Sequence, residues 1–203
     1  VILYDPQKEI REEIGNEIEK KENRILIKPY DDYDIIAGQG TAGYEITKDL
    51  ENLSITPDMY LCCCGGGGLV AGTSTYLKYK YPNLTSYAVE PYGFDDTKIS
   101  LFNKKITANK PGFQSICDAI ITPQPGQLTF PINLKTLSGG IVVEDQEVKN
   151  SIKILAEHLK IVVEPGGAVA ATAALSKKID LKNKIVVVMI SGGNIDLDIF
   201  RSL

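Results

Sequence analysis

Runs of apolar residues alternate along the chain with stretches in which apolar residues recur every three or four positions. The runs have the length of strands and lie at residues 1–4, 25–27, 59–64, 85–89 and 185–190. The periodic stretches are typical of amphipathic helices, and Ile10, Ile14 and Ile18 form the first of them. Strands that alternate with helices predict an α/β fold with a mostly parallel, twisted sheet and helices on both faces.

The first thirty residues predict a complete strand–helix–strand unit. Asp5 is the expected N-cap of the helix, and Pro6 has the fixed φ that suits a first helical position. The runs at 1–4 and 25–27 would then be a parallel pair of strands.

Polar and turn-forming residues between 31 and 40 indicate a domain boundary. Here Gly38-Gln39-Gly40 predicts a hinge, and Thr41 is placed to cap a helix that reaches about Leu50. The later helices are expected over 69–79, from an Asp145 N-cap to Leu159, and after the segment Glu164-Pro165-Gly166-Gly167 to about Leu175, with 91–130 irregular.

Charge and composition exclude several classes of function. The 203 residues carry a net charge of −4 without a basic stripe, so we expect no nucleic-acid partner. No apolar run reaches the length of a membrane span, and the N-terminus leads into charged sequence rather than a signal peptide. Cys62, Cys63 and Cys64 are adjacent, and neighbouring strand residues face opposite ways, so they do not converge on one metal. We therefore predict buried, reduced thiols in a cytoplasmic protein.

Four consecutive glycines separate the run at 59–64 from the helix expected at 69–79. Bare amides at a helix N-terminus are suited to bind a phosphate, and glycine lets the backbone come close to it. No lysine follows as in a Walker A motif, and Val70 stands where a dinucleotide fingerprint needs its third glycine. The residues themselves leave two alternatives open, an anion cradle and a tight turn without a ligand.

Five groups of short segments occur in a fixed order along the chain. They are PYDD at 29–32 with AGQGT at 37–41, GGGGLVAG at 65–72, VEP at 89–91 with DD at 95–96, VEPGGA at 163–168, and SGGNID at 191–196. Together they resemble fold-type II pyridoxal-phosphate (PLP) enzymes of the threonine dehydratase and serine racemase kind. The order and the spacing carry this resemblance from one end of the chain to the other.

The resemblance implies roles for particular residues. In that family a Ser after the last core strand bonds the pyridine nitrogen of PLP, and Ser191 matches it. A neutral hydroxyl does not force that nitrogen to stay protonated, which suits Cα deprotonation and β-elimination. Glu164 matches a Glu near the cofactor ring, and its alternative role is to stabilise a helix start. The residues implied to hold the phosphate are Gly65, Gly66, Gly67, Gly68 and Leu69.

Part of the same family has a divalent-cation site, and its pattern is present here. The matching ligands are the Glu90 carboxylate, the Phe94 carbonyl and the Asp96 carboxylate. Oxygen ligands of this kind suit Mg²⁺ or Ca²⁺. The alternative is a solvated acidic loop.

The resemblance begins inside the family's small domain. It implies that residues 1–36 are a remnant of that substrate domain and that 37–203 are the large PLP-binding domain without its N-terminal segment. No lysine here lies in the S-x-K-x-R-G segment that carries the family's catalytic lysine, and its Ser-x-Gly-Asn-His segment is missing too. The chain also starts with Val1 in a strand-like run, so we interpret it as a C-terminal portion.

The function that the resemblance implies is a serine/threonine dehydratase-like ammonia-lyase, which converts a hydroxy-amino acid into a 2-oxo acid. Without the lysine we expect the chain to be inactive alone and to need its N-terminal portion, with a second copy as a further expected partner. The alternative is a non-catalytic remnant that folds and binds phosphate, a metal or a partner chain.

Overall fold

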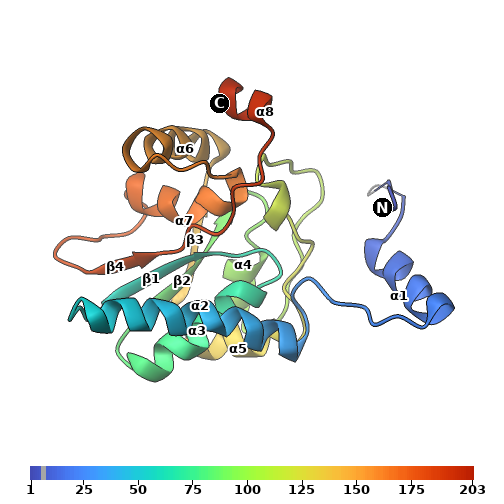
Figure 1. Cartoon of the computed structure of the whole chain (residues 1–203), viewed down its shortest axis with the longest axis horizontal. Coiled ribbons are helices and arrows are strands. Elements are labelled where there is room, and N and C mark those ends of the chain that lie inside the picture. The colour runs from blue at the N-terminus through green and yellow to red at the C-terminus, as the bar shows by residue number, and fades with distance from the viewer. Residues whose placement is uncertain (6–7) are drawn as a thin grey trace.

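The computed structural model describes residues 1–5 and 8–203. At its centre is a four-stranded sheet in the order β3-β2-β1-β4, in which each strand is parallel to its neighbours (Figure 1). The strands are β1 (Met59–Cys63), β2 (Thr85–Pro91), β3 (Gly139–Val143) and β4 (Val186–Val188). The predicted α/β fold with a parallel sheet is confirmed.

Helices cover both faces of this sheet, with α2, α3 and α5 on one side and α6 and α7 on the other (Figure 1). The covering helices are α2 (Tyr33–Asn52), α3 (Gly68–Lys80), α5 (Thr129–Thr136), α6 (Asp145–Leu159) and α7 (Pro165–Leu175). The other helices are α1 (Arg11–Glu22), α4 (Asp96–Asn103), α8 (Leu197–Ser202) and a 3₁₀ turn at Asp118–Ile120. Among the described residues, no helix combines the length and the apolar character that crossing a bilayer requires.

The hydrophobic core is built around β1, all five of whose residues are buried. Tyr60 in this strand satisfies its buried hydroxyl by donating to Thr73 Oγ1 of α3 at 2.9 Å. On the opposite face, α7 is buried from 165 to 173 because it lies between the sheet and α6. A helix covered on all sides has no polar face, which explains its small, apolar composition.

The predicted strand–helix–strand unit at the N-terminus is wrong in both of its strands. Neither 1–4 nor 25–27 joins a sheet in the described chain, and their large apolar side chains are mostly exposed. Two parallel strands without further strands to cover an apolar face are not stable alone. α1 gives them no support because it buries none of its own residues.

The first helix also begins later than predicted. α1 starts at Arg11 with Ile10 as its N-cap, so the prediction of Asp5 as the cap is wrong. The Asp5 carbonyl instead accepts a hydrogen bond from the Glu9 N–H at 2.8 Å, in a separate turn. Pro6, predicted at the first helical position, lies outside the described residues.

A single helix runs through the predicted hinge. α2 begins at Tyr33, and the Asp32 carboxylate caps it by accepting an amide hydrogen bond at 2.8 Å. Thr41 lies inside α2, where its hydroxyl donates to the Gly38 carbonyl at 2.6 Å, so its prediction as an N-cap is wrong. The glycines of this stretch are helical rather than in a bend; Gly40 lies against Gly72 of α3, whereas a Cβ at Gly38 would meet no atom within 4 Å.

Residues 91–130 contain more regular structure than predicted, because α4, the 3₁₀ turn and the start of α5 lie there. β3 was not predicted either. It begins with two glycines, and a Cβ at Gly140 would collide with Lys98 of α4. The position of β3 therefore depends on close approach to its neighbours rather than on an apolar pattern of its own.

The cap of α6 is one residue away from its predicted place. Glu144 and Glu147 form a reciprocal capping box at the helix start. The predicted cap, Asp145, instead accepts hydrogen bonds from Ser115 Oγ at 2.7 Å and the Ile116 N–H at 3.0 Å. This carboxylate therefore ties a distant loop to the helix.

Candidate cofactor site

The tetraglycine loop connects the end of β1 to the N-terminus of α3. Gly67 is the N-cap and has φ +91°, a left-handed conformation that glycine adopts without steric cost. In the described chain, the amide N–H groups of residues 65–69 donate to no protein acceptor. Unpaired amides at a helix N-terminus carry partial positive charge, so the loop can accept an anion.

The ring of Tyr30 lies against this loop. A Cβ added at Gly66 would collide with the ring, and one added at Gly68 would come 2.9 Å from the Tyr30 Cβ. Burial, followed by the charges of nearby carboxylates, raises the pKa of Tyr30, so its hydroxyl is neutral. The sequence analysis did not predict this contact, which places an aromatic side chain over part of the expected cradle.

Ser191 follows β4, which is the strand next to β1, and lies beside the glycine loop that follows β1. The thiol of Cys63, the last residue of β1, donates to Ser191 Oγ at 3.2 Å. β1 and β4 are adjacent parallel strands, so their carboxyl ends meet at one edge of the sheet, where open α/β sheets bind ligands. The Ser191 hydroxyl accepts from the thiol and keeps its own proton available for a ligand.

Glu164 joins the turn after Ser191 to the start of α7. Its backbone N–H donates to the Gly192 carbonyl at 3.0 Å, and its carboxylate accepts the Asn194 N–H at 3.1 Å. A Cβ at Gly192 would collide with that carboxylate, so a larger residue here would displace the Glu164 side chain. Glu164 is also the N-cap residue of α7, so both roles considered for it agree with its position.

One cavity of about 280 Å³ brings the expected cofactor residues together. Residues 65–69, Ser191 and Glu164 all line it. Among the residues that sequence reasoning missed, Tyr30, Cys63 and Arg11 line it as well. The sequence had indicated no site role for these three residues. Tyr30 was noted only as part of the PYDD segment and Cys63 only as part of a buried strand, and no pattern pointed to Arg11.

Glu90 and Asp96 lie close together, and each has hydrogen-bond partners within the protein. The Glu90 carboxylate accepts the N–H groups of Thr97 at 2.8 Å and Lys98 at 2.9 Å, at the N-terminus of α4. Asp96 accepts a hydrogen bond from the Asn109 amide, while its Oδ2 is buried without a partner in the described chain. Within the part of the chain that the structure describes, no three His, Cys, Asp or Glu side chains are grouped to hold a metal.

Burial also changes the acidity of these two carboxyl groups. Burial, followed by the charge of Asp96, raises the pKa of Glu90 well above its ordinary value, and burial raises the pKa of Asp96 to about 7. Phe94, the third expected ligand, lies in the turn between them, where its N–H donates to the Pro91 carbonyl at 3.0 Å. The three expected ligands are neighbours in the fold, and their role as a cation site stays a prediction.

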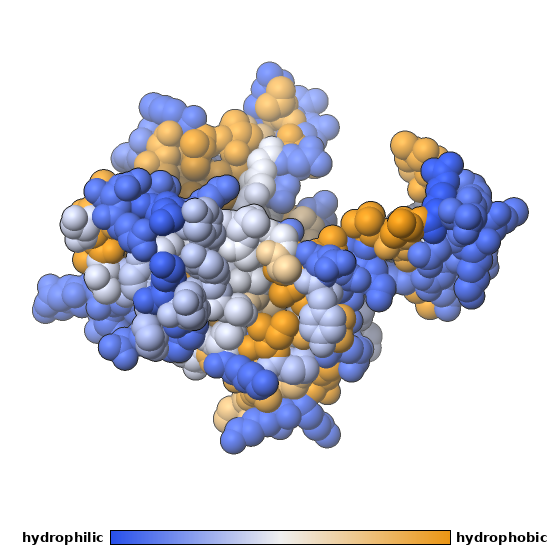
Figure 2. All heavy atoms as spheres, turned by 60° about the horizontal axis from the view of Figure 1, so that its bottom comes forward, coloured by the Kyte–Doolittle hydropathy of each residue, from blue (hydrophilic) through white to orange (hydrophobic). Residues whose placement is uncertain are grey.

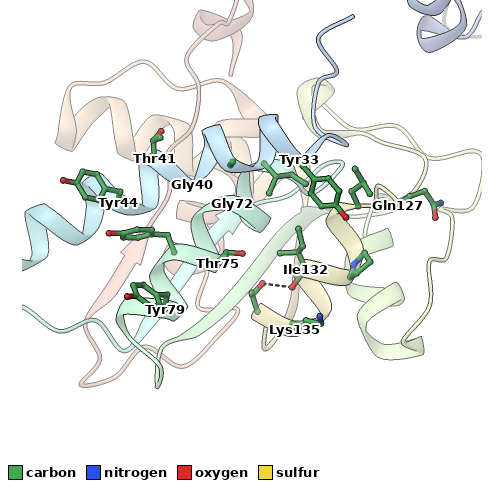
Figure 3. Close-up of a pocket in the computed structure, with 16 residues that line it drawn as sticks. Tyr33, Gly40, Thr41, Tyr44, Gly72, Thr75, Tyr79, Gln127, Ile132 and Lys135 are labelled. Atoms are coloured by element: carbon green, nitrogen blue, oxygen red, sulfur yellow. Dashed lines mark hydrogen bonds between the residues drawn. The ribbon is translucent and has the colours of Figure 1, made fainter.

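A larger hollow of about 980 Å³ lies elsewhere, between α2, α3 and α5. Figure 3 shows Tyr33, Tyr44 and Tyr79 along this groove, whose lining is mostly apolar. None of the expected site residues lines it. The smaller cavity is the better candidate because unpaired amides, a hydroxyl and a carboxylate converge on it.

The chain is similar to known PLP enzymes over most of its length. The family model described as "Pyridoxal-phosphate dependent enzyme" matches residues 1–192. The serine racemase of Schizosaccharomyces pombe is 36% identical over 198 residues, which cover 98% of this chain and 60% of that protein. The catabolic L-threonine dehydratase of Escherichia coli K12 is 36% identical over 184 residues, which cover 90% of this chain and 54% of that protein. The structure of maize serine racemase superposes with a TM-score of 0.88 at 29% identity, covering 99% of this chain and 61% of that one.

Proposed function

The chain belongs to the pyridoxal-phosphate dependent enzyme family, and we propose from this premise that its tetraglycine loop, Ser191 and Glu164 hold PLP. The proposed reaction is β-elimination of a hydroxy-amino acid such as serine or threonine to a 2-oxo acid. The names of the two relatives, a serine racemase and a threonine dehydratase, support a substrate of this class. The chain spans 60% or less of these relatives, so the activity of the whole protein is part of the proposal.

The observation that carries the proposal is the set of unpaired amides at residues 65–69, which belong to residues that line the same cavity as Ser191. A phosphate at the start of α3 would accept hydrogen bonds from these amides and would also be stabilised by the helix dipole. Contact with Gly66 requires the Tyr30 ring to move aside, because the ring lies on that glycine.

At the other end of the cavity, Ser191 would bond the pyridine nitrogen. The Cys63 thiol orients this hydroxyl by donating to it, so that its proton points to the ligand. Glu164 holds the turn at 192–194 through two hydrogen bonds and keeps Ser191 in place. When bound, PLP supplies an electron sink for loss of the Cα proton of an amino acid.

The proposal extends to a divalent cation, Mg²⁺ or Ca²⁺, at Glu90, Asp96 and the Phe94 carbonyl. It is supported by the unpaired, buried Oδ2 of Asp96 and by the position of the three oxygen groups as neighbours in the fold. Oxygen ligands suit both ions.

We propose that this chain alone does not turn over a substrate, because none of its lysines lies in an S-x-K-x-R-G segment. A polypeptide that carries that segment would complete the site, and a second copy of the chain is a further proposed partner. Four free, buried cysteines support a reducing compartment, and we place the protein in the cytoplasm. The second candidate function, a non-catalytic remnant that binds phosphate, is favoured by the same missing lysine.

The test begins with binding of PLP, of pyridoxal and of inorganic phosphate, measured by equilibrium dialysis on the wild-type chain. We expect PLP and phosphate to bind and pyridoxal to bind at least tenfold more weakly, since it lacks the phosphoryl group. Gly66→Ala should weaken PLP binding at least tenfold, because its Cβ would fill the space over this glycine that the phosphate takes once the Tyr30 ring has moved aside. The matched control is Gly38→Ala, because a Cβ there meets no atom within 4 Å.

The second step separates the two candidate functions. Serine or threonine is added with PLP, and pyruvate or 2-oxobutyrate is followed. No product is expected from the chain alone, and product should appear when a polypeptide with the lysine segment is supplied. Continued inactivity of a complex that forms would favour the non-catalytic remnant, whereas equal PLP and pyridoxal affinities would overturn the phosphate cradle itself.

A further inference from the structure

The two central peptides of the glycine loop are held from behind by α5. The Gly66 carbonyl accepts hydrogen bonds from Thr129 Oγ1 at 2.6 Å and from the Gly126 N–H at 3.2 Å. The Gly67 carbonyl accepts from Asn133 Nδ2 at 3.3 Å and, as the first acceptor of α3, from the Ala71 N–H at 2.9 Å. Thr129 and Asn133 are both fully buried, and neither lines the 280 Å³ cavity.

These bonds decide where the amide protons of the loop point. In a planar trans peptide, the carbonyl of one residue and the N–H of the next point in opposite directions. Holding the Gly66 carbonyl on the α5 side therefore turns the Gly67 N–H away from α5. The Gly67 carbonyl fixes the Gly68 N–H in the same way. Residues 66–68 line the cavity whereas Thr129 and Asn133 do not, so the side away from α5 is the side of the cavity.

We infer that Thr129 and Asn133 are positioning residues that aim the Gly67 and Gly68 N–H groups into the cavity. The use of these N–H groups to bind phosphate rests on the proposed function. The aim itself rests on the four hydrogen bonds that the two carbonyls accept, two of them from the side chains of Thr129 and Asn133.

Asp31 keeps the start of α5 in register with the loop. Its carboxylate accepts the N–H groups of Gln127 at 3.0 Å, Leu128 at 2.8 Å and Thr129 at 3.3 Å. This carboxylate is the N-terminal cap that α5 lacks in its own sequence. Asp31 follows Tyr30, so one short segment contacts the front of the glycine loop and also anchors the helix behind it.

Asn133 gives a way to separate positioning from stability. Its Nδ2 bonds the loop, but its Oδ1 is buried without a partner in the described chain, which costs folding free energy. Asn133→Leu removes that unpaired oxygen while keeping the number and the branching of the side-chain heavy atoms. The thermal stability should therefore change little, whereas the Gly67 carbonyl loses its side-chain donor.

The experiment compares Thr129→Val and Asn133→Leu with Thr136→Val. Thr136 is the matched control, because it lies on the same helix and bonds Ser74 of α3 at 2.8 Å, away from the loop. Inorganic phosphate and PLP affinities are measured by dialysis, and the Gly67 and Gly68 amide signals by ¹⁵N NMR. We expect about a tenfold loss of affinity in each loop variant with shifted glycine signals, and neither change in the control.

The possible outcomes distinguish the positioning role of Thr129 and Asn133 from the proposed phosphate cradle. Wild-type affinity and unmoved Gly67 and Gly68 signals in both loop variants would overturn the positioning role, even if the wild type binds phosphate well. If the wild-type chain binds no phosphate, the proposed cradle is overturned, and the amide signals of Thr129→Val alone decide whether α5 aims the loop. A melting temperature unchanged in Asn133→Leu shows that lost affinity does not come from unfolding.

Discussion

The four thiols differ in acidity, and the difference follows from their partners. Burial raises the pKa of Cys64 well above its ordinary value and that of Cys117 to about 12. The pKa of Cys63 is lowered, first by its side-chain hydrogen bond with Cys62 and, against the opposing effect of burial, also by the one with Ser191, whose hydroxyl donates once the thiol has lost its proton. Cys63 and Cys64 both line the cavity, and of these two Cys63 is the thiol whose pKa is lowered.

Alkylation by iodoacetamide should therefore modify Cys63 at a lower pH than Cys64 or Cys117. Because the thiolate is the nucleophile, a lower pKa raises the reactive fraction at a given pH. Ser191→Ala should raise the pKa of Cys63 and slow its alkylation several-fold near pH 8. Fragment-resolved mass spectrometry over a pH series measures this, with Ser202→Ala as an exposed control. Equal rates at Cys63 and Cys117 would contradict the assignment.

Removal of metal tests the carboxylates of β2 and α4. If a cation lies between Glu90 and Asp96, EDTA should lower the Tm by about 5 °C, and added Mg²⁺ or Ca²⁺ should restore it. Asp96→Asn should abolish the metal response. An identical Tm with and without EDTA in the wild type would leave Glu90 as a helix-capping carboxyl only, the role its two amide hydrogen bonds already give it.

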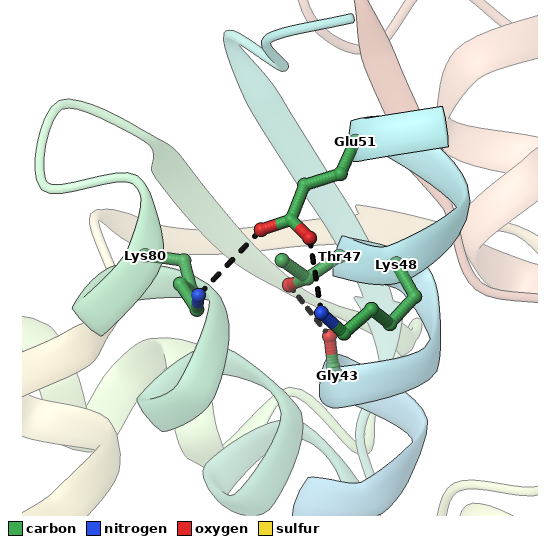
Figure 4. A network of polar contacts seen from close by, with 5 residues as sticks. All are labelled: Gly43, Thr47, Lys48, Glu51 and Lys80. Carbon is green, nitrogen blue, oxygen red and sulfur yellow. Dashed lines mark hydrogen bonds and ion pairs between the residues drawn. The ribbon is translucent and has the colours of Figure 1, made fainter. Parts of the chain in front are cut away.

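At the scale of elements, the α2–α3 pair depends on glycines at the crossing of the two helices. A Cβ at Gly43 would lie 2.8 Å from the Thr73 carbonyl oxygen and 3.2 Å from the Thr73 Cα. Both contacts are with backbone, which cannot rotate away. Beyond the crossing, Figure 4 shows Lys48 and Lys80 directed at Glu51, at 3.2 Å and 3.5 Å. These side chains are exposed, so solvent screens their attraction.

Gly43→Ala should lower the free energy of unfolding by about 1–3 kcal/mol, because the two helix backbones must separate. Gly38→Ala, on the same helix with no atom within 4 Å, should be neutral or stabilising. Glu51→Ala should leave stability within experimental error. Urea denaturation of the three variants measures their free energies of unfolding and so ranks their stability. A loss in Glu51→Ala as large as that in Gly43→Ala would show that the ion pairs hold the helices together.

At the scale of the whole molecule, the chain has a packed body and a projecting N-terminal segment. Figure 1 shows α1 away from the sheet layers, and Figure 2 shows apolar surface on the link that joins it to the body. Ile25 is 85% exposed and Ile27 is 71% exposed, so this link buries little. α2 runs continuously across residues 36 and 37, and the division of the chain into domains there stays a prediction.

Limited trypsin digestion should cut first in the N-terminal segment, at basic residues between 11 and 28. A fragment that begins near Pro29 should persist, since Asp31 ties the chain there to α5 through three hydrogen bonds. Mass spectrometry over a time course identifies the first cut. A first cut at Lys78 or Lys80 of α3 would show that the body opens more readily than the segment.

Sequence patterns alone predicted the sheet strands β1, β2 and β4, the helices α3, α6 and α7, and the glycine loop between strand and helix. These depend on runs, periodicity and glycine, which are local properties of the chain. The resemblance added Ser191 and Glu164, which the structure places at the same cavity as the loop.

Tertiary structure alone decided the rest. The apolar runs at 1–4 and 25–27 are not strands because no neighbouring strand pairs with them in the described chain, whereas β3 forms from a glycine-rich stretch because β2 lies beside it. The contact of Tyr30 with the glycine loop, and the hydrogen bonds that Thr129 and Asn133 donate to this loop, join residues far apart in sequence. No local pattern can show such contacts. The sequence by itself determines which segments can be strands, helices or a bare loop; packing determines which of them find partners and which way the amides of the loop point.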